Sequence, residues 1–406
     1  MVGSSITDRN VGNTRLLIEV WLPAPRGAVL PPRPPPTFKL ALAPTIGPTV
    51  GGYLTDLASW HWLFFINIVP GIIVTIAAIT LIDFDQPDLK LFERFDWVGL
   101  ISMAMFLGAL EYVLEDGPRW DWFEDSTIAL AAVVSAAAAV FFLRVLTAGE
   151  PIVDLRAFVD RNFAVGSVFS FVLGIGLYGL TYLYPIYLSQ IRGHNALMIG
   201  ETMFVSGVTM FFCAPIVGRL VTRLDPRVML TAGFAIVALS NWQMSYITKD
   251  WDFWQLFVPQ ILRGFGMMLA IVPITNISLG TLPPDRLKNA SGLFNLTRNL
   301  GGAVGLAALN TVFDKRIDLH LARLHDSITW NRPSVLEALN AFAARIPGSD
   351  AQAMALKELF VFTRMQGVVM AFADVFLLLS LMFVVFGALV WFMRRPAAVA
   401  APSGGH

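Results

Sequence analysis

Four ionisable residues lie inside long apolar stretches of the sequence: Glu111, Arg263, Arg298 and Asp374. A charge at the centre of a membrane-spanning helix costs about 2.5 kcal/mol or more, so a charged residue in such a stretch is a candidate for function. Glu111 lies about one turn from the end of its stretch and is expected to be solvated. Arg298 is expected near a helix end, where its long side chain reaches water, which favours a structural role.

Arg263 and Asp374 are the candidates for a proton or substrate pathway. Arg263 lies near the middle of its stretch. It would be either a pathway cation with a carboxylate partner or one half of an ion pair that locks two helices. Asp374 would be either a proton-binding carboxylate held away from water or a carboxylate at the interface that caps a late-starting helix.

Aromatic and amide side chains could line a cavity for apolar compounds, cationic ones included. The candidates are Tyr178 and Tyr182 in one stretch and Asn276 in another. Aromatic rings tolerate varied ligands and attract cations. Tyr184 and Tyr187 share the stretch of the first two, and a position in lipid or at the membrane interface fits these two at least as well.

The stretches that carry these residues indicate an all-α, polytopic membrane protein. The chain is 56% hydrophobic and 14% charged, whereas soluble domains carry about 25% charged residues. A bilayer core of about 30 Å needs about 20 apolar residues in a helix, and long continuous runs exclude a β-barrel. We expect about ten transmembrane helices, although the tenth stretch is too short to span a bilayer by itself. The stretches are 63–81, 97–114, 126–146, 163–189, 197–221, 226–247, 254–280, 288–313 and 366–393, with 40–54 as the tenth.

Composition also excludes several classes of protein. The single cysteine, Cys213, rules out a disulfide framework, and the five histidines are scattered, so no metal site is expected. A formal net charge of zero argues against nucleic acid as a partner. No G-x-x-x-x-G-K-[ST] loop is present, so ATP is not the expected energy source. No constellation of His, Asp or Glu suggests an enzyme.

Basic residues concentrate on one side of the predicted helices. If the connector 54–62 faces outward, the short outward connectors hold only Arg119, Arg192 and Lys249, and the inward connectors hold many more. The positive-inside rule then places the C-terminal tail, 394–406, in the cytoplasm. The long connector 314–365 falls on the outer side, where we expect a small helical structure.

The most specific pattern is a run of small residues that contains Gly47, Pro48, Gly51 and Gly52. Small residues on one face let helices approach closely, and a proline bends the helix axis. Together with Trp62–Asn67, the run closely resembles the antiporter motif in the fifth helix of major facilitator drug exporters. The alternative is an ordinary packing seam of small residues.

The resemblance extends over nearly all of residues 41–395. The connector 151–155 and the segment 280–298 look like the corresponding parts of EmrB/QacA-type drug:H⁺ antiporters, which have fourteen spans. The pair of stretches within 97–146 matches their two extra central helices, and the long outer connector is most similar to the EmrB subtype. The resemblance implies a structural or gating role for Asp154.

A second glycine run repeats the first. Gly301 and Gly302 belong to a run that echoes the seam at 47–52, as the equivalent helix of a second half should. Under the resemblance these glycines and Arg298 are structural or gating residues.

The resemblance also implies that the chain begins within the fifth helix and lacks the first four helices of the family. Residues 39–81 are then a remnant of the N-terminal half, and 163–393 form the six-helix C-terminal half. Residues 1–38 contain a proline-rich run at 31–36, which cannot be helix interior. We expect them to be non-homologous and disordered.

The function that the resemblance implies is secondary active transport. The chain would export hydrophobic compounds, as multidrug efflux proteins do, from the inner (plasma) membrane, with a proton gradient and no cofactor as the energy source. A truncated remnant that inserts without transporting is the alternative, and a membrane-embedded enzyme is a further one. The EmrB subtype also implies a periplasmic adaptor and an outer-membrane channel as partners.

Overall fold

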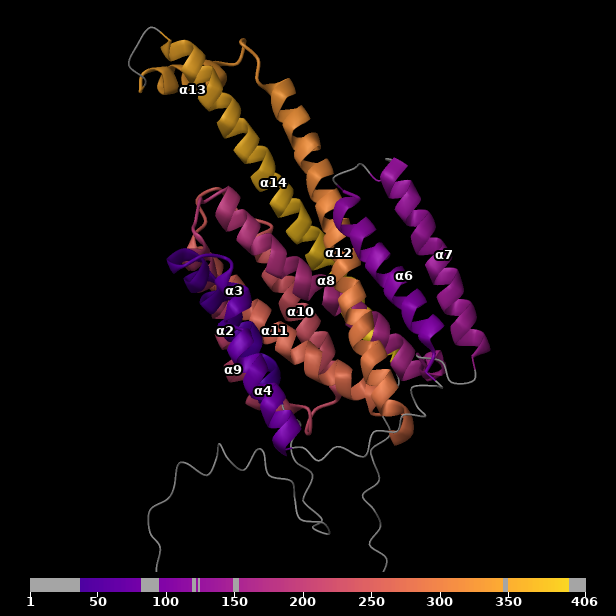
Figure 1. Ribbon diagram of the computed structural model, residues 1–406. Helices are drawn as coiled ribbons and strands as arrows, with labels where there is room; N and C mark the ends of the chain where they lie inside the picture. Colours follow the sequence, from indigo (N-terminus) through magenta and orange to yellow (C-terminus); the bar gives the residue numbers. More distant parts are fainter. Residues whose placement is uncertain are drawn as a thin grey trace, which may run out of the picture. The chain divides into compact units, whose positions relative to one another are not determined.

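The computed structural model of the chain describes residues 37–81, 95–118, 122, 125–148, 153–345 and 350–393 (Figure 1). These residues form helices joined by turns, and none of them is in a strand. The helices from Thr37 onward pack as one unit. The predicted all-α fold is confirmed for this part of the chain. Residues 1–36 and the tail 394–406, on which two of the predictions fall, lie outside the described residues.

The helices follow the apolar stretches of the sequence, because in lipid a helix satisfies its backbone hydrogen bonds within one segment. Their bounds are α2 (Thr37–Leu57), α3 (Trp62–Phe65), α4 (Ile68–Leu81), α6 (Trp97–Asp116), α7 (Asp125–Thr147), η1 (Leu155–Val159), α8 (Arg161–Gln190), α9 (Ala196–Leu220), α10 (Pro226–Met244), α11 (Phe253–Leu279), α12 (Pro284–Ser327), α13 (Pro333–Ala343), α14 (Ala351–Leu389) and η2 (Val390–Phe392).

Seven helical segments of the described residues are long and apolar enough to cross a membrane. The other three predicted spans, 40–54, 226–247 and 288–313, coincide with α2, α10 and α12, which pack against α9, α11 and α8 respectively. The chain is therefore a multi-pass membrane protein, and the total of about ten spans stays a prediction. The seven are Trp62–Thr80, Trp97–Asp116, Ser126–Thr147, Arg161–Gln190, Ala196–Leu220, Phe253–Leu279 and Ala351–Phe392.

Polar connector residues fix where five helices begin. Each of these helices starts after an Asp or Asn whose side chain accepts a hydrogen bond from a backbone N–H of the first turn, which has no partner within the helix. At α11 the cap is reciprocal, since the Gln255 side chain also accepts from the backbone N–H of the capping residue. The caps are Asp96 on α6, Asp160 on α8, Asn195 on α9, Asp225 on α10 and Asp252 on α11.

Two helices are much longer than the predicted spans. α12 has 44 residues, a length of about 66 Å, against a bilayer core of about 30 Å. α14 begins at Ala351, well before the predicted start at 366. The helices described within the connector 314–365 are therefore the end of α12, the short helix α13 and the start of α14, which project together from the other helices (Figure 1). We call residues 314–365 the hairpin.

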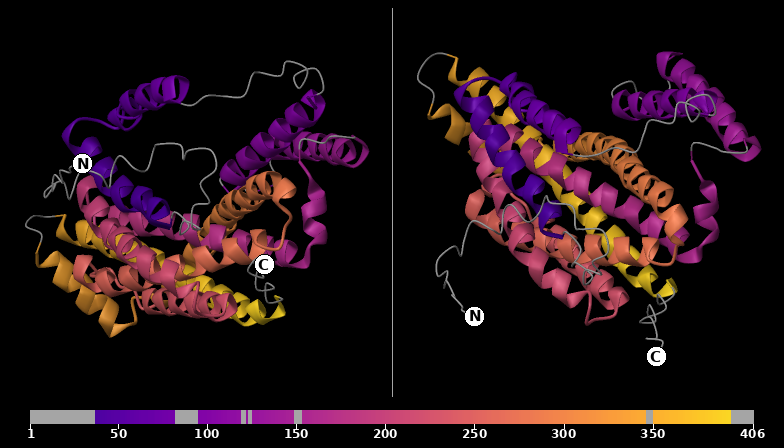
Figure 2. Two further views of the ribbon diagram at one scale, coloured as in Figure 1. Left: turned by 90° about the horizontal axis from the view of Figure 1, so that it is seen from below. Right: turned by 60° about the horizontal axis from the view of Figure 1, so that its bottom comes forward.

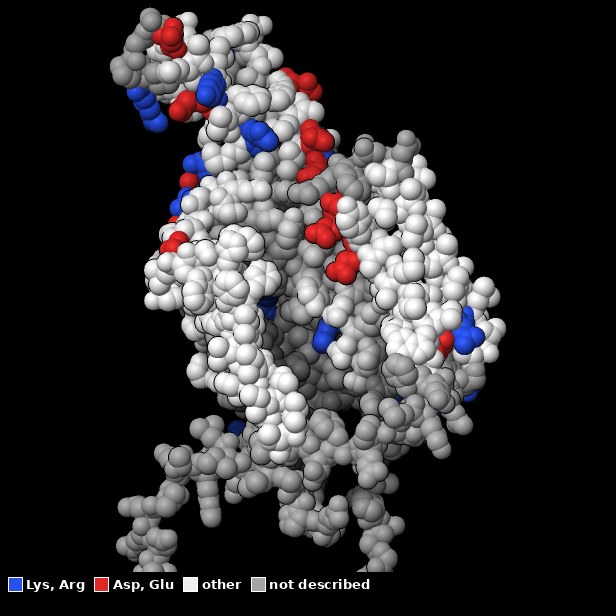
Figure 3. Space-filling view, viewed as in Figure 1, with Lys and Arg blue, Asp and Glu red and all other residues white. Residues whose placement is uncertain are grey.

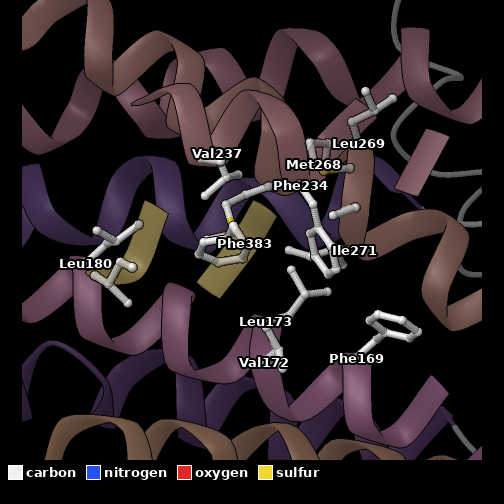
Figure 4. Close-up of a cluster of buried hydrophobic side chains, with 14 of the residues drawn as sticks. Phe169, Val172, Leu173, Leu180, Phe234, Val237, Met268, Leu269, Ile271 and Phe383 are labelled. Carbon is white, nitrogen blue, oxygen red and sulfur yellow. The ribbon is translucent and has the colours of Figure 1, made fainter. Parts of the chain in front are cut away.

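The core lies among α8, α10, α11 and α14. Figure 4 shows side chains from these four helices turned toward one another, among them Leu173, Phe234, Met268 and Phe383. All four are less than 3% exposed. Many other large apolar side chains, such as those of α4, are exposed, as expected for surfaces that face lipid.

The helices α6 and α7 form a separate antiparallel pair (Figures 1 and 2). An ion pair of 2.9 Å between Asp96 and Arg144 joins the start of α6 to the end of α7. In the connector between the two helices, the Trp122 indole N–H donates a hydrogen bond to the Thr311 hydroxyl on α12 at 3.1 Å. The pair is therefore anchored to the helix that also forms the hairpin.

Candidate functional site

Arg263 is buried in the middle of α11. Its side chain is 5% exposed, and Nη2 donates a hydrogen bond to the Thr181 hydroxyl on α8 at 2.8 Å. The guanidinium lies over the ring of Tyr184, 5.3 Å from the ring centroid, which is within the range of a cation–π contact. Among the described residues no carboxylate pairs with Arg263, although both sequence interpretations expected one.

One nitrogen of Arg263, Nη1, is buried without a hydrogen-bond partner among the described residues. A cavity of about 80 Å³ adjoins the side chain, between α2, α8, α9 and α11. Its walls are mostly apolar, with methionines prominent, and we call it the Arg263 cavity. A guanidinium has five N–H donors and no acceptor, so the free donor suits an anionic or oxygen-bearing group. The lining residues are Pro48, Leu177, Thr181, Met203, Ser206, Met210, Arg263, Gly264 and Met267.

The motif that resembles the antiporter motif forms the contact between α2 and α9. A Cβ atom on Gly52 would collide with the backbone carbonyl of Ala196 at the start of α9. Reciprocally, a Cβ on Gly200 would lie 2.6 Å from the carbonyl oxygen of Pro48. Gly47 faces open space, and Gly51 faces only a Leu63 side chain. Two of the four motif residues, Pro48 and Gly52, therefore carry the close approach of the helix backbones.

The second glycine run forms the contact between α8 and α12. A Cβ on Gly301 would collide with the carbonyl of Phe171, and one on Gly302 with the ring of Tyr178. From the other side, a Cβ on Gly174 would collide with the carbonyl of Arg298. The Arg298 guanidinium itself donates to the Asn295 side chain of its own helix at 2.7 Å.

Tyr178 and Tyr182 are partly exposed on α8, at 40% and 37%. The Tyr178 hydroxyl donates to the Asn299 amide oxygen on α12 at 3.0 Å. With Glu111 of α6 these two residues line a second cavity of about 380 Å³ between α6, α8 and α12, so Glu111 lies close to a predicted pathway residue. Tyr182 and Asn276, also exposed, line neither cavity.

Figure 3 shows the face on which α6 and α12 lie. Lys and Arg side chains lie within a hollow of this face, and Asp and Glu side chains gather above them over α6 and α12. The exposed acidic residues of α6 and α12 include Glu111, Glu115, Asp314 and Asp318.

The interface position considered for Tyr184 and Tyr187 is wrong. Both side chains are fully buried in the core. The Tyr187 hydroxyl donates to the carbonyl oxygens of Thr248 at 2.6 Å and Trp251 at 3.1 Å. The tyrosine therefore joins α8 to the connector before α11 and faces neither lipid nor headgroups.

Asp374 lies in the interior of α14 and does not cap it. Its Oδ2 atom lies 2.8 Å from Nε2 of His320 and 3.4 Å from Nη1 of Arg316, both on α12. The sequence did not identify these two partners, because they lie beyond the apolar part of α12. Charged residues four positions apart, at 316 and 320, share one helix face, and that spacing is the signal that could have found them. We call Arg316, His320 and Asp374 the hairpin-base cluster.

Asp154 lies outside the membrane-spanning helices. Its side chain accepts a hydrogen bond from the backbone N–H of Arg156 at 3.0 Å and so starts the short helix η1. Six residues on, Asp160 caps α8 and also accepts from the Thr281 hydroxyl at 3.0 Å. Asp160, which follows the connector 151–155, is thus in contact with Thr281 of the segment 280–298. Among the described residues no group of three His, Cys, Asp or Glu could hold a metal ion.

Comparison with known proteins gives the family. Residues 40–306 match the Major Facilitator Superfamily. The chain is 37% identical over 359 residues to the colistin resistance protein EmrB of Acinetobacter baumannii, covering 87% of this chain and 70% of that protein. It is 31% identical over 378 residues to the multidrug export protein EmrB of Escherichia coli K12, covering 91% and 72%.

The fatty acid resistance protein FarB of Neisseria gonorrhoeae is 30% identical over 371 residues, covering 90% of this chain and 71% of that protein. The helices and the extent of these matches agree with the resemblance read from the sequence. The match indicates a transporter rather than an enzyme. The chain belongs to the major facilitator superfamily and is related to its EmrB-type members.

Proposed function

We propose that the chain exports hydrophobic compounds across the membrane in exchange for protons. The observation that carries this proposal is the buried Arg263, which lines a cavity between four helices and whose Nη1 has no hydrogen-bond partner among the described residues. Ionisable groups at such depth are costly and are kept where a substrate or ion passes. The names of the relatives, a multidrug export protein and a fatty acid resistance protein, support the same class of function.

The charge of Arg263 bears on which compounds are exported. The sequence interpretation allowed for cationic compounds near Tyr178 and Tyr182. A guanidinium without a carboxylate partner favours instead compounds that carry one negative charge on an apolar body. The methionine and leucine walls of the Arg263 cavity suit such a body. The fatty acid resistance protein among the relatives is consistent with this preference.

Location and partners are part of the same proposal. The positive-inside distribution supports a cytoplasmic C-terminus in the inner (plasma) membrane, which leaves the hairpin 314–365 on the outer side. Similarity to EmrB proteins supports a periplasmic adaptor and an outer-membrane channel as partners. The proton gradient would drive alternating access, with a site near the midplane exposed first to one side and then to the other.

Transport by the purified chain tests the proposal. The chain and its Arg263→Gln variant are reconstituted in proteoliposomes with an imposed pH gradient, and the movement of a fluorescent fatty acid and of a cationic dye is followed. We expect gradient-dependent export of the anion by the parent and at least about a tenfold loss in R263Q, because the variant lacks the buried charge.

Arg364→Gln is the matched control, because Arg364 is an exposed arginine of α14 that lines neither cavity, and this variant should retain most of the export. Size-exclusion profiles show whether each variant is folded. A folded parent chain that moves neither probe would overturn the proposal and favour the remnant that inserts without transporting. Full export by R263Q would remove Arg263 from the pathway.

A further inference from the structure

The hairpin-base cluster joins two helices at one point. His320 and Arg316 lie one turn apart on α12, and both approach the same carboxylate oxygen of Asp374 on α14. The cluster lies where the hairpin 314–365 meets the packed helices. A change in its charge would therefore act on the crossing of α12 and α14.

The imidazole of His320 is the buried member of the cluster. Its side chain is 8% exposed, against 30% for Asp374 and 47% for Arg316. Nε2 contacts Asp374, whereas Nδ1 is buried without a hydrogen-bond partner among the described residues. The contact with the carboxylate assigns the proton of a neutral imidazole to Nε2, which leaves Nδ1 as an acceptor. The partly exposed Asp374 and Arg316 give protons a route from the surface.

Protonation of His320 changes which hydrogen-bond partners its ring nitrogens need. A proton that binds Nδ1 forms an N–H bond and turns the neutral imidazole into an imidazolium, while the Nε2 contact to Asp374 is kept. Among the described residues the new N–H has no acceptor, and Arg316 already shares the Asp374 oxygen. A buried donor without an acceptor is unfavourable. The protonated cluster therefore favours a different crossing of α12 and α14.

Other ionisable groups lie around the cluster. Near it on α12 are Asp314 and Asp318, which are exposed together with Lys315 and Arg323, and within two turns of Asp374 on α14 there is none. The packed helix α8 contributes Tyr187, whose hydroxyl points to the carbonyls of Thr248 and Trp251. The other helices packed on α12 and α14 bear the ionisable residues Glu111, Tyr112, Glu115 and Asp116 on α6, Arg227 on α10, Arg263 on α11 and Glu337 on α13.

Aromatic contacts connect the cluster to Arg263. Phe372 and Phe376 flank Asp374 on α14, and their rings meet Tyr187 and Tyr184 at centroid distances of 5.7 Å and 5.5 Å. The Arg263 guanidinium lies over that same Tyr184 ring. All four rings are fully buried. A shift of α14 would thus move the aromatic surface on which the guanidinium rests, since close-packed side chains transmit displacements.

We infer that His320 and Asp374 form a proton-binding site, and that the Phe376–Tyr184 contact transmits its protonation to Arg263. The inference rests on the proposed function in that the bound proton is the one exchanged for substrate. In the proposed orientation the site faces the outer side, where an exporter takes up protons. Histidine is the side chain best suited to gain and lose a proton near neutral pH.

The first test measures the helix crossing without transport. Cys213 is the only cysteine, so Cys213→Ser allows spin labels at two exposed positions, Ala322→Cys on α12 and Ala353→Cys on α14. We expect the label-to-label distance to shift between about pH 8 and about pH 6. The shift should vanish in His320→Gln and persist in His325→Gln, a control on the same helix that lies outside the cluster. A shift that persists in H320Q, or none in the parent, would overturn the proton site.

The second test measures transport in the same proteins. Between about pH 8 and about pH 6 the export rate of the parent should change about tenfold or more. In H320Q the export rates at the two pH values should be nearly equal. Phe376→Leu should keep the distance shift and lose the pH dependence of export. An F376L variant that behaves like the parent would overturn the link to Arg263. If the parent exports nothing, the proposed function fails, and the spin-label distances still decide the proton site.

Discussion

The guanidinium of Arg263 is held in an apolar interior without a counterion among the described residues. Burial of an unpaired charge is strongly unfavourable. Two contacts offset part of that cost: the hydrogen bond to Thr181 and the face of the Tyr184 ring. A desolvated cation–π contact contributes about 2 kcal/mol. Tyr184 therefore matters to the charge next to it as well as to the core.

Substitution at Tyr184 tests this contribution. Tyr184→Leu removes the aromatic face and should lower the thermal unfolding temperature in detergent, with a cost of about 2 kcal/mol or more from the lost cation–π contact and the altered packing. Tyr184→Phe keeps the ring and should stay close to the parent. Equal losses in the two variants would mean that the ring face does not stabilise Arg263.

A surface ion pair predicts a dependence of stability on pH. The hydrogen bond from Arg192 at 2.8 Å lowers the pKa of Asp252, with help from the backbone N–H of Phe253. Because the pKa is lowered on folding, the ion pair stabilises the folded protein above the unfolded pKa of about 3.9. This stabilisation is lost as the pH falls through the folded pKa, which lies below that value. Both groups are partly exposed, so the contribution is below about 1 kcal/mol.

Unfolding temperatures measured from about pH 7 to about pH 3 check this expectation. The Asp252→Asn variant should be slightly less stable than the parent at neutral pH, and the difference should shrink in acid. Asp250→Asn is the control, because Asp250 is 70% exposed and pairs only with its neighbour Lys249 among the described ion pairs. A difference between D252N and the parent that grows in acid would contradict the assignment.

At the scale of helices, hydropathy located most elements and misjudged two. The predicted spans 288–313 and 366–393 end or begin where polar residues replace apolar ones, whereas α12 and α14 continue. Half of residues 314–327 are good helix formers and none is glycine or proline, so the helix outlasts the hydrophobic pattern. His320 was missed for that reason. The pairing of Asp374 with α12 depends on a helix crossing, which periodicity along one chain does not contain.

The glycine motif shows the same limit of sequence interpretation. The pattern of Gly47, Pro48, Gly51 and Gly52 indicated a close helix contact, but the partner helix, α9, and the glycines that touch it follow only from the packing. Gly52→Ala should collide with the carbonyl of Ala196 and cost about 1–3 kcal/mol, as overpacking does. Gly47→Ala, with open space around it, is the matched control.

Thermal unfolding and the fraction of monodisperse protein in detergent would measure both variants. G52A should lose stability, and G47A should match or slightly exceed the parent, because alanine favours the helix over glycine. If G47A were as destabilised as G52A, the motif would act through helix propensity or lipid contacts and not through the seam between α2 and α9.

For the whole molecule, the Arg263 cavity is where the first described helix meets the later ones. Pro48 of α2 lines it together with residues of α8, α9 and α11. In alternating access, parts of a transporter rock about a central site, so the seam beside that site must open and close. The contact between α2 and α9 borders the Arg263 cavity, and under the proposed function it is the seam that would open and close.

A cross-link across this seam should therefore stop transport. The Asn195 amide donates to the Asp56 carboxylate at 3.4 Å, so Asp56→Cys and Asn195→Cys in a Cys213→Ser background place two thiols near each other. A short bifunctional maleimide should join them and abolish gradient-driven export, whereas either single cysteine variant should continue to export after the same treatment. Asn195 also caps α9, so its replacement should lower the stability of the protein by about 1 kcal/mol. The double variant without cross-linker is therefore the reference for export. Undiminished export by the cross-linked protein would show that α2 and α9 move together, and the moving boundary would then lie elsewhere among the helices.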